Sequence, residues 1–367
     1  MMKTARVAVD SLNVRNAPVT GDIRYQLHRG DRLNVIREVD GWLEISRPES
    51  PCWVKGAMAE MLGVPGEITA NEISVSGKKL MLPDGTSFAK LFKLGAFNSG
   101  KTKMEQFIAA NPGLFATMKP SLVRVARAVS INEGALEAIN TWDSAFLSFG
   151  IFQWTSGPGS DAGELPAMLA RLAREDADAY AFYFGKYGLD LEMPATPAAL
   201  PTGKFRLGGD LLSSPAKKGQ LRSPIWAYRF WRAGHDPAIR KAEIGHALDR
   251  IGAFYDKTST GLKNKRVRDW VSSELGVAQL LDQHVNRPGH VIDCVAAAIA
   301  KVLNAGAPAN PSGWGDAQEA ALLKHYLEIR ATFGSLPMTN STARADEIAK
   351  AVAAGKLSAK RNSFDGF

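Results

Sequence analysis

The chain has 367 residues, of which 45% are hydrophobic and 22% are charged. This balance is ordinary for a folded protein and excludes wholesale disorder, collagen and a multi-span membrane protein. Lys and Arg number 45 against 37 Asp and Glu, a formal net charge of +8, which favours a polyanionic partner: nucleic acid, an acidic membrane surface or a cell-wall polymer. The two cysteines, Cys52 and Cys294, predict no disulfide framework and no structural zinc site, and no cofactor motif is found.

The first residues include Lys3 but no apolar stretch of signal-peptide length. Nowhere does the sequence reach the ~18 consecutive apolar residues of a membrane-spanning helix. We therefore expect a protein that is made in the cytoplasm without a signal peptide, does not partner a membrane, and is delivered to its place of action by another route.

Residues 1–62 predict a small all-β domain. Short alternating apolar stretches are separated by turn residues, and Asp40-Gly41 between two such stretches is a strong hairpin signal. Five or six short strands in about sixty residues favour a small barrel.

The same segment resembles bacterial Src-homology-3-like domains in residues 12–18 (LNVRNAP), 27–31 (LHRGD), 40–45 (DGWLEI) and 53–54 (WV). In that family such modules often accompany cell-wall enzymes and bind peptidoglycan peptides, so the resemblance implies a wall-binding domain. The alternative for Trp42 and Trp53 is that they simply fill the core of the barrel.

Residues 63–102 are rich in Gly, Pro and Ser and predict a linker that has room for a hairpin. From residue 103 the apolar periodicity is helical, and 103–338 is expected to form one mainly helical domain, with 189–223 mostly loop and a C-terminal tail at 339–367. The expected helices are 103–110, 120–140, 163–187, 224–234, 237–256, 266–286, 289–305 and 315–333, with a short one at 344–355 in the tail.

The stretch from residue 130 to 155 holds the candidate chemistry. The helix that begins near Pro120 has one apolar face leading toward Glu133, so this carboxyl group is expected at or near a packed helix end. Removal from water raises the pKa of a carboxyl group, which suits a general acid at neutral pH. Glu137, one turn later, is interpreted as a solvated neighbour.

This stretch resembles the lysozyme-like superfamily. Phage-type lysozymes have a Glu-Gly pair at a helix end, then a carboxylate, a small hydroxyl residue and a Gly in a β-hairpin; here Glu133-Gly134 is followed by Asp143 after ten residues, one more than in the family, by Ser148 after fifteen and by Gly150 after seventeen. Lytic transglycosylases and goose-type lysozymes share a Gly-apolar-apolar-Gln phrase, which residues 150–153 (GIFQ) match.

The resemblance implies that Glu133 protonates the leaving oxygen, that Asp143 acts as base or electrostatic stabiliser, and that Ser148 holds the water. It also implies a sugar-binding groove, for which the candidates are Trp142, Gly150, Gln153 and Trp154. Asp143 has a turn-cap alternative, and Ser148 and Gln153 could be ordinary hydrogen-bonding residues of the hairpin. If Asp143 points away, substrate assistance or an anhydro product is favoured, as in transglycosylases.

Two further regions stay open. The aromatic residues at 180–187 and 226–231 pack in a core or line a groove, and the polar phrase 282–290 either lines the far side of a cleft or ends a helix. No Gly-x-Ser-x-Gly elbow, phosphate loop or dinucleotide fingerprint occurs.

The sequence therefore predicts two domains: a small all-β Src-homology-3-like barrel and a mainly α-helical lysozyme-like domain with a short β-hairpin. The expected function is that of a muramidase, a glycosidase of peptidoglycan that serves as an endolysin or a secreted antibacterial effector. The alternatives are a lytic transglycosylase, a chitosanase-like glycosidase, and a non-catalytic wall-binding or structural protein.

Peptidoglycan is the expected partner, together with an immunity protein or a secretion or phage apparatus. The protein would act on the cell wall, in the periplasm or outside the cell, after release or secretion. No nucleic-acid partner is expected, because Lys and Arg are scattered and no nucleic-acid motif is present.

Overall fold

The computed structural model describes residues 2–196 and 198–366, and the internal contacts of the chain divide it into two compact units. The first unit comprises residues 1–101, 135–197 and 201–243, and the second comprises residues 102–134, 198–200 and 244–367. Each unit is thus assembled from segments that are distant in the sequence.

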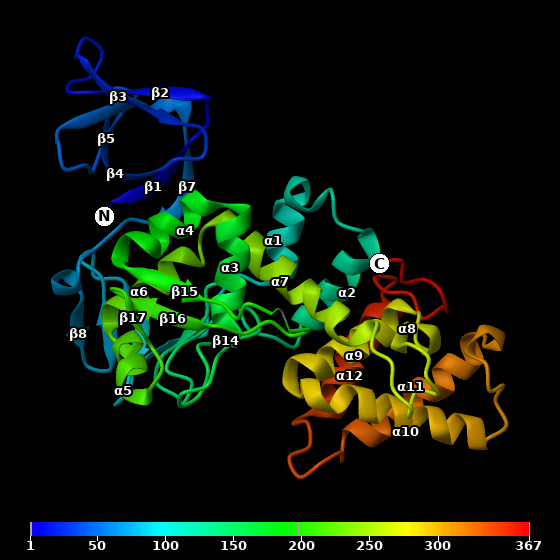
Figure 1. Cartoon of the computed structure of the whole chain (residues 1–367). Coiled ribbons are helices and arrows are strands. Elements are labelled where there is room, and N and C mark those ends of the chain that lie inside the picture. Colours follow the sequence, from blue (N-terminus) through cyan, green and yellow to red (C-terminus); the bar gives the residue numbers. More distant parts are fainter. Residues whose placement is uncertain (1, 197, 367) are drawn as a thin grey trace. The chain divides into compact units, whose positions relative to one another are not determined.

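The first seven strands form one antiparallel sheet in the order β3-β2-β6-β5-β4-β1-β7 (blue in Figure 1). Asp40 and Gly41 both have positive φ (46° and 77°) and join the paired residues Val39 and Trp42, which confirms the hairpin expected there. The strands are β1 (Lys3–Val7), β2 (Ser11–Arg15), β3 (Ile23–His28), β4 (Arg32–Val39), β5 (Trp42–Ile45), β6 (Cys52–Lys55) and β7 (Ala59–Pro65).

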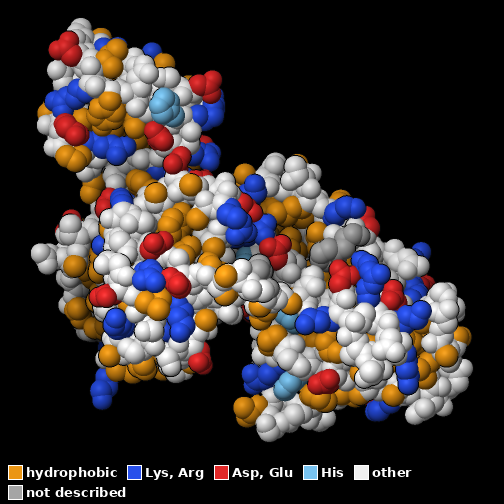
Figure 2. Space-filling model, viewed as in Figure 1, with side chains coloured by type: hydrophobic (Ala, Val, Ile, Leu, Met, Phe, Trp, Pro, Cys, Tyr) orange, Lys and Arg blue, Asp and Glu red, His pale blue; other side chains and the backbone are white. Residues whose placement is uncertain are grey.

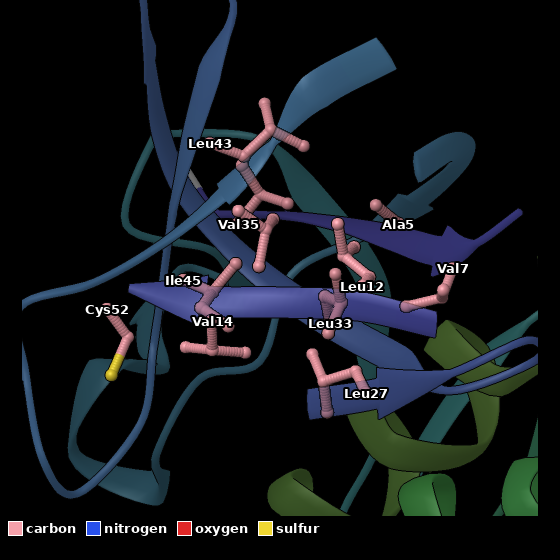
Figure 3. Packing of buried hydrophobic residues seen from close by; sticks show 11 residues of the cluster. Ala5, Val7, Leu12, Val14, Leu27, Leu33, Val35, Leu43, Ile45 and Cys52 are labelled. Carbon is pink, nitrogen blue, oxygen red and sulfur yellow. The ribbon is translucent and has the colours of Figure 1, made fainter. Parts of the chain in front are cut away.

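Alternate side chains of these strands converge on a single core, as Figure 3 shows. Val14 and Ile45 are fully buried there, and Leu12 and Leu33 are 1% exposed. Since strands β1 to β6 all contribute to this core, the N-terminal region is a β structure with its own apolar interior. The expected order, a β region followed by a helical region, is confirmed at this level.

A second seven-stranded antiparallel sheet has the order β14-β13-β12-β11-β10-β9-β8. Residues 63–102, expected as a linker, hold the end of β7 and four of these strands, so the segment is a structural part of the first unit. The strands are β8 (Ser74–Ser76), β9 (Lys79–Met81), β10 (Ser87–Leu91), β11 (Ala96–Asn98), β12 (Ile139–Asn140), β13 (Ser148–Phe149) and β14 (Trp154–Thr155).

The helix expected at 120–140 is shorter than its pattern indicated. Helix α2 (Pro120–Ser130) ends ten residues early, and β12 begins at Ile139. Leu136 and Ile139 are completely buried, so tertiary burial beside the sheet overrides the helix propensity of this stretch.

The rest of the first unit consists of helices and a small sheet. The sheet lies where mostly loop was expected, and Asp176 divides the helix expected at 163–187 because its side chain caps α4 by accepting the Ala179 N–H. The sheet is made of β15 (Leu189–Glu192), β16 (Lys204–Leu207) and β17 (Asp210–Leu211), and the helices are α3 (Leu165–Glu175), α4 (Ala177–Tyr183), α5 (Pro215–Lys218), α6 (Pro224–Ala233) and the beginning of α7 (Pro237–Tyr255).

The second unit is helical. The helix expected at 266–286 is divided in two, because Ser273 caps the second part by accepting the Gly276 N–H. Among the described residues no helix combines the length and the apolar character needed to cross a membrane. Besides α2 and the end of α7, the helices are α1 (Met104–Ala110), α8 (Val267–Trp270), α9 (Glu274–Asn286), α10 (Val291–Asn304), α11 (Asp316–Arg330) and α12 (Ser341–Ala353).

A buried ion cluster joins the N-terminal sheet to the helices of the first unit. The Arg32 side chain on β4 has no exposed surface, and it donates to Asp236 at 2.8 Å and to Asp176 at 3.0 Å. The Tyr183 hydroxyl also donates to Asp236, at 2.9 Å. Because a buried charge is tolerated only with its partners in place, this cluster is expected to fix the β region on the rest of the unit.

Replacing Asp236 with Asn should therefore destabilise the protein by about 3–5 kcal/mol, since Arg32 would keep a buried charge with one partner neutralised. Urea unfolding measures this loss. The matched control is Asp10→Asn, whose ion pair with Arg29 is exposed and should contribute almost nothing. Equal, small losses in both variants would contradict the assignment.

Candidate active site

Glu133 lies just beyond the C-terminal end of α2, in the second unit. Its backbone N–H donates to the Ser130 carbonyl oxygen at 3.1 Å, which continues the last turn of the helix. The preceding helix buries Val125 and Val129 completely, so the apolar face of α2 holds the helix end in the core of the unit. The Glu133 side chain keeps only 12% of its surface exposed.

Arg344, on α12, is the ionic partner of this carboxylate. Its Nη2 donates to Glu133 Oε1, and the same guanidinium donates to Asp282 at 2.7 and 3.0 Å. A third bond, of 3.0 Å, goes from Arg344 to the Asn132 carbonyl oxygen. One arginine is therefore shared between two carboxylates and is oriented by a backbone group beside Glu133.

Asp282, on α9, anchors this arrangement from within the unit. It is fully buried and also accepts from Arg330 at 3.2 Å and from the Asn132 side chain at 3.2 Å. Arg330 is 1% exposed. Both Asp282 oxygens are thus occupied by donors, so this carboxylate positions Arg344 rather than facing a substrate.

Burial raises the pKa of Glu133 to about 7, against the opposing attraction of Arg344, and the negative charge of Asp282 adds to the rise. The physical reason is that an ionised carboxylate loses hydration in this position, while the arginine that could compensate is already paired with Asp282. A carboxyl group of this pKa carries a proton in an appreciable fraction of molecules at neutral pH and is able to donate it.

Asp143 lies in the first unit, in the turn between β12 and β13. Its two carboxylate oxygens accept from the Asn140 side chain at 2.8 Å and from the Ala145 N–H at 2.9 Å. Arg222 fastens the same turn by donating to the backbone oxygens of Thr141 and Asp143, at 2.8 and 2.6 Å. The geometry gives Asp143 the role of an Asx-turn residue, and its role as a catalytic base stays a prediction.

The other residues expected in the groove lie on strands β12, β13 and β14 or in the turns between them. Trp142 is 41% exposed and stacks on Phe92, with ring centroids 5.3 Å apart. Ser148 and Trp154 are buried, at 3% and 2% exposure. Gln153 is half-buried, and its side-chain amide donates to the Gly150 carbonyl oxygen at 2.8 Å. Of these side chains, Trp142 presents the largest surface to a ligand.

Gly150 is required by its surroundings. Its φ is +78°, and a Cβ atom there would lie 2.3 Å from the Glu243 carboxylate. Glu243 is fully buried and accepts the Ile151 N–H at 3.0 Å, and burial raises its pKa well above the ordinary value. The Gly-apolar-apolar-Gln phrase is therefore held by a buried acid on α7 that the sequence analysis did not single out.

The interpretation of Glu137 as solvated was wrong. It is 3% exposed, and its carboxylate accepts the Lys101 N–H at 2.6 Å and lies 3.5 Å from Arg240. Its apolar neighbours in the sequence, Leu136 and Ala138, which are both buried, could have indicated this burial, since an acid within an apolar stretch is more often paired than exposed.

Glu133 belongs to the second unit, whereas the other six candidate residues belong to the first. The β12–β14 strands bring those six into one region, and Arg344 and Asp282 accompany Glu133 in the other.

Within residues 2–196 and 198–366, no group of three or more His, Cys, Asp or Glu side chains is arranged to hold a metal ion. Comparisons with protein-family models, curated proteins and solved structures found no match.

The raised pKa of Glu133 predicts a pH-dependent stability. Between about pH 4.5 and 7 the folded protein retains a proton that the unfolded chain has released, so the folded state loses stability as the pH rises through this window. Gln carries no titrating proton. The stability of Glu133→Gln relative to the wild type should therefore increase from pH 5 to pH 8, by up to about 3 kcal/mol.

Thermal unfolding at a series of pH values measures this difference. Glu347→Gln is the matched control, because Glu347 is also in the second unit but is 43% exposed and pairs with Lys350. Its difference from the wild type should stay flat over the same range. A Glu133→Gln difference that is equally flat would rule out a desolvated carboxyl group.

Proposed function

We propose that this chain is a peptidoglycan-degrading glycosidase, a muramidase that cleaves the MurNAc–GlcNAc backbone with Glu133 as general acid. The observation that carries the proposal is the Glu133 carboxyl group, withdrawn from water at the end of α2 and paired with an arginine that Asp282 shares. Glycoside cleavage needs a proton on the leaving oxygen at the moment the bond breaks. A positioned acid of matched pKa contributes about 10²–10⁴-fold to such a step.

Arg344 supports the same step after the proton has left. Glu133 then carries a negative charge against the guanidinium, and a charge-assisted hydrogen bond stabilises that charge. Asp282 keeps the arginine in place without competing for the substrate, because it is fully buried. Arg344 and Asp282 are thus positioning residues for the proposed acid.

Lytic transglycosylation is the second candidate, and the state of Asp143 favours it. Both Asp143 oxygens already accept a hydrogen bond within its own turn, which leaves fewer lone pairs to orient a water molecule. A reaction that uses a single carboxylic acid and is completed by a group of the substrate itself does not need Asp143 as a base. The residues proposed to shape the sugar groove, Trp142, Gly150, Gln153 and Trp154, and Ser148, proposed to hold water for hydrolysis, all belong to the first unit.

The N-terminal β region fits this function as a wall-binding domain of the Src-homology-3-like kind. The supporting features are the sequence phrases in residues 12–54 and the single core shared by six short strands. A basic protein would be attracted to the anionic wall. We propose that the protein acts there as an endolysin or a secreted antibacterial effector. The following experiment distinguishes this function from chitosanase-like cleavage and from wall binding without cleavage.

Purified sacculi should be incubated with the wild type and with Glu133→Gln, and the soluble products identified by mass spectrometry. The wild type should release glycan fragments, with reducing ends if water attacks and with an anhydro sugar if the reaction is a transglycosylation. The Gln variant cannot donate the proton, so its rate should fall by at least about 100-fold.

Glu347→Gln again serves as the control and should release fragments at the wild-type rate. Release by Glu133→Gln at that same rate would refute Glu133 as the acid. Binding of sacculi without any release by the wild type would instead support a non-catalytic wall-binding protein, and cleavage of chitosan alone would redirect the substrate assignment.

A further inference from the structure

The sheet β8–β14 carries a concentration of positive charge that has few acidic residues near it in the sequence. Residues 73–101 contain five lysines and one acidic residue, Asp84. Figure 2, by contrast, shows Lys and Arg interspersed with Asp and Glu over the face that it draws. All five lysines are exposed. Four of them cluster on strands β9 and β10 and the turns beside them, and none of these four forms an ion pair within the part of the chain that the structure describes: Lys78, Lys79, Lys90 and Lys93.

Two of these lysines oppose each other directly. Lys79 on β9 and Lys90 on β10 are cross-strand partners in the antiparallel register. Like charges in this position repel each other and destabilise the strand pair. A bound anion would relieve this repulsion, so the pair is better suited to a ligand than to the stability of the free sheet.

The lysines surround a hollow in the surface. Lys78, Lys79, Lys90, Lys93 and Phe92 line a hollow of about 760 Å³. A second hollow of about 230 Å³ shares Lys79 and Lys90 and is bounded by Phe97. Lys79 and Lys90 thus each border both hollows.

An exposed aromatic platform adjoins the lysines. Phe92 is 43% exposed and stacks on Trp142, which is 41% exposed, and the ring planes are inclined by 25°. Leu94, two residues along the chain from Phe92, is 56% exposed. Flat apolar surface beside positive charge suits a sugar ring, whose C–H face packs on aromatic side chains while its acidic substituents pair with lysine.

The register connects this site to the strands of the candidate groove. Lys79, Lys90, Phe97, Asn140 and Ser148 are successive cross-strand partners on β9 to β13. Directly opposed residues share a face of the sheet, and strands about 4.8 Å apart place the two ends of this row about 19 Å from each other. The row is exposed at Lys79 and Lys90, half-buried at Phe97 and Asn140, and buried at Ser148, so a ligand meets it at the lysine end.

We propose that this lysine face binds an anionic glycan strand, with carboxylate or phosphate groups on Lys79 and Lys90 and a sugar ring on the Phe92–Trp142 platform. The choice of a wall glycan rests on the function proposed above. Single-stranded nucleic acid also uses aromatic and basic side chains, but it requires a series of stacking platforms along a channel, whereas this face offers one stacked pair.

The test is binding of the full chain, in the Glu133→Gln background so that no cleavage intervenes. Co-sedimentation should be compared for two double variants, Lys79→Gln/Lys90→Gln and the charge-matched control Lys257→Gln/Lys265→Gln, whose lysines are exposed in the second unit. The probes are sacculi that carry phosphate polymers, the same sacculi stripped of them, uncharged chitin, and an oligothymidylate strand.

The Lys79/Lys90 variant should bind sacculi at least fivefold more weakly at low salt, whereas the control should bind as the parent does. The thermal stability of the Lys79/Lys90 variant should equal or slightly exceed that of its parent, because the repulsion between the two lysines is removed. A Trp142→Ala variant should also bind more weakly. A defect confined to the polymer-bearing sacculi identifies phosphate as the ligand group, and a defect on both kinds identifies carboxylate.

Equal binding by the two double variants, or tighter parental binding to oligothymidylate than to sacculi, would overturn the proposal. The result also separates this inference from the proposed function. If binding depends on the lysines but the wild type releases no glycan, the binding site is supported and the proposed activity is not. If the wild type releases glycan but binding does not depend on the lysines, the activity is supported and the binding site is not.

Discussion

One arginine of the second unit serves two acids, and the protonation of Glu133 depends on this sharing. Arg344 contacts both Glu133 and Asp282, and Asp282 is fully buried and also paired with Arg330. If Arg344 were available to Glu133 alone, their attraction would favour the ionised carboxylate. Because the positive charge is shared, the loss of hydration prevails and the pKa of Glu133 rises to about 7, so an appreciable fraction of molecules carries the proton at neutral pH. The same network explains why α2, α9, α11 and α12 must be assembled before the site exists.

The sequence was sufficient for the features that depend on local periodicity. Helices near 237–256, 289–305 and 315–333 were expected and are found at Pro237–Tyr255, Val291–Asn304 and Asp316–Arg330, because each has a continuous helical pattern between clear end signals. The Asp40-Gly41 hairpin was predictable for a similar reason, since those two residues accept the positive φ that the turn requires. Glu133 was expected near a helix end, but the end of α2 at Ser130 is set by the burial of the residues that follow.

Features that depend on contacts between residues distant in the sequence could not be predicted from the sequence. Strands β8 to β11 have three to five residues each, and their sheet is completed by the distant strands β12 to β14. The sequence of this segment alone therefore indicated a linker. Arg344 is 211 positions from Glu133, and no local pattern marks it as the partner. The burial of Glu137 and Glu243 is likewise a product of packing. The distribution of the net charge of +8 is also visible only in the folded chain. Arg32 and Arg330 pair with buried acids, whereas the exposed lysines of residues 73–101 form no ion pair among the residues that the structure describes.

The central claim is that Glu133 acts as a carboxylic acid that is protonated near neutral pH. The direct test is the rate of glycan release from sacculi, measured from about pH 3.5 to pH 9. The account predicts an alkaline limb with a midpoint near pH 7, the pKa of Glu133, above which the rate falls about tenfold per pH unit. A midpoint near 4.5, where an ordinary solvated Glu titrates, or a rate that rises from pH 7 to pH 9, would contradict it.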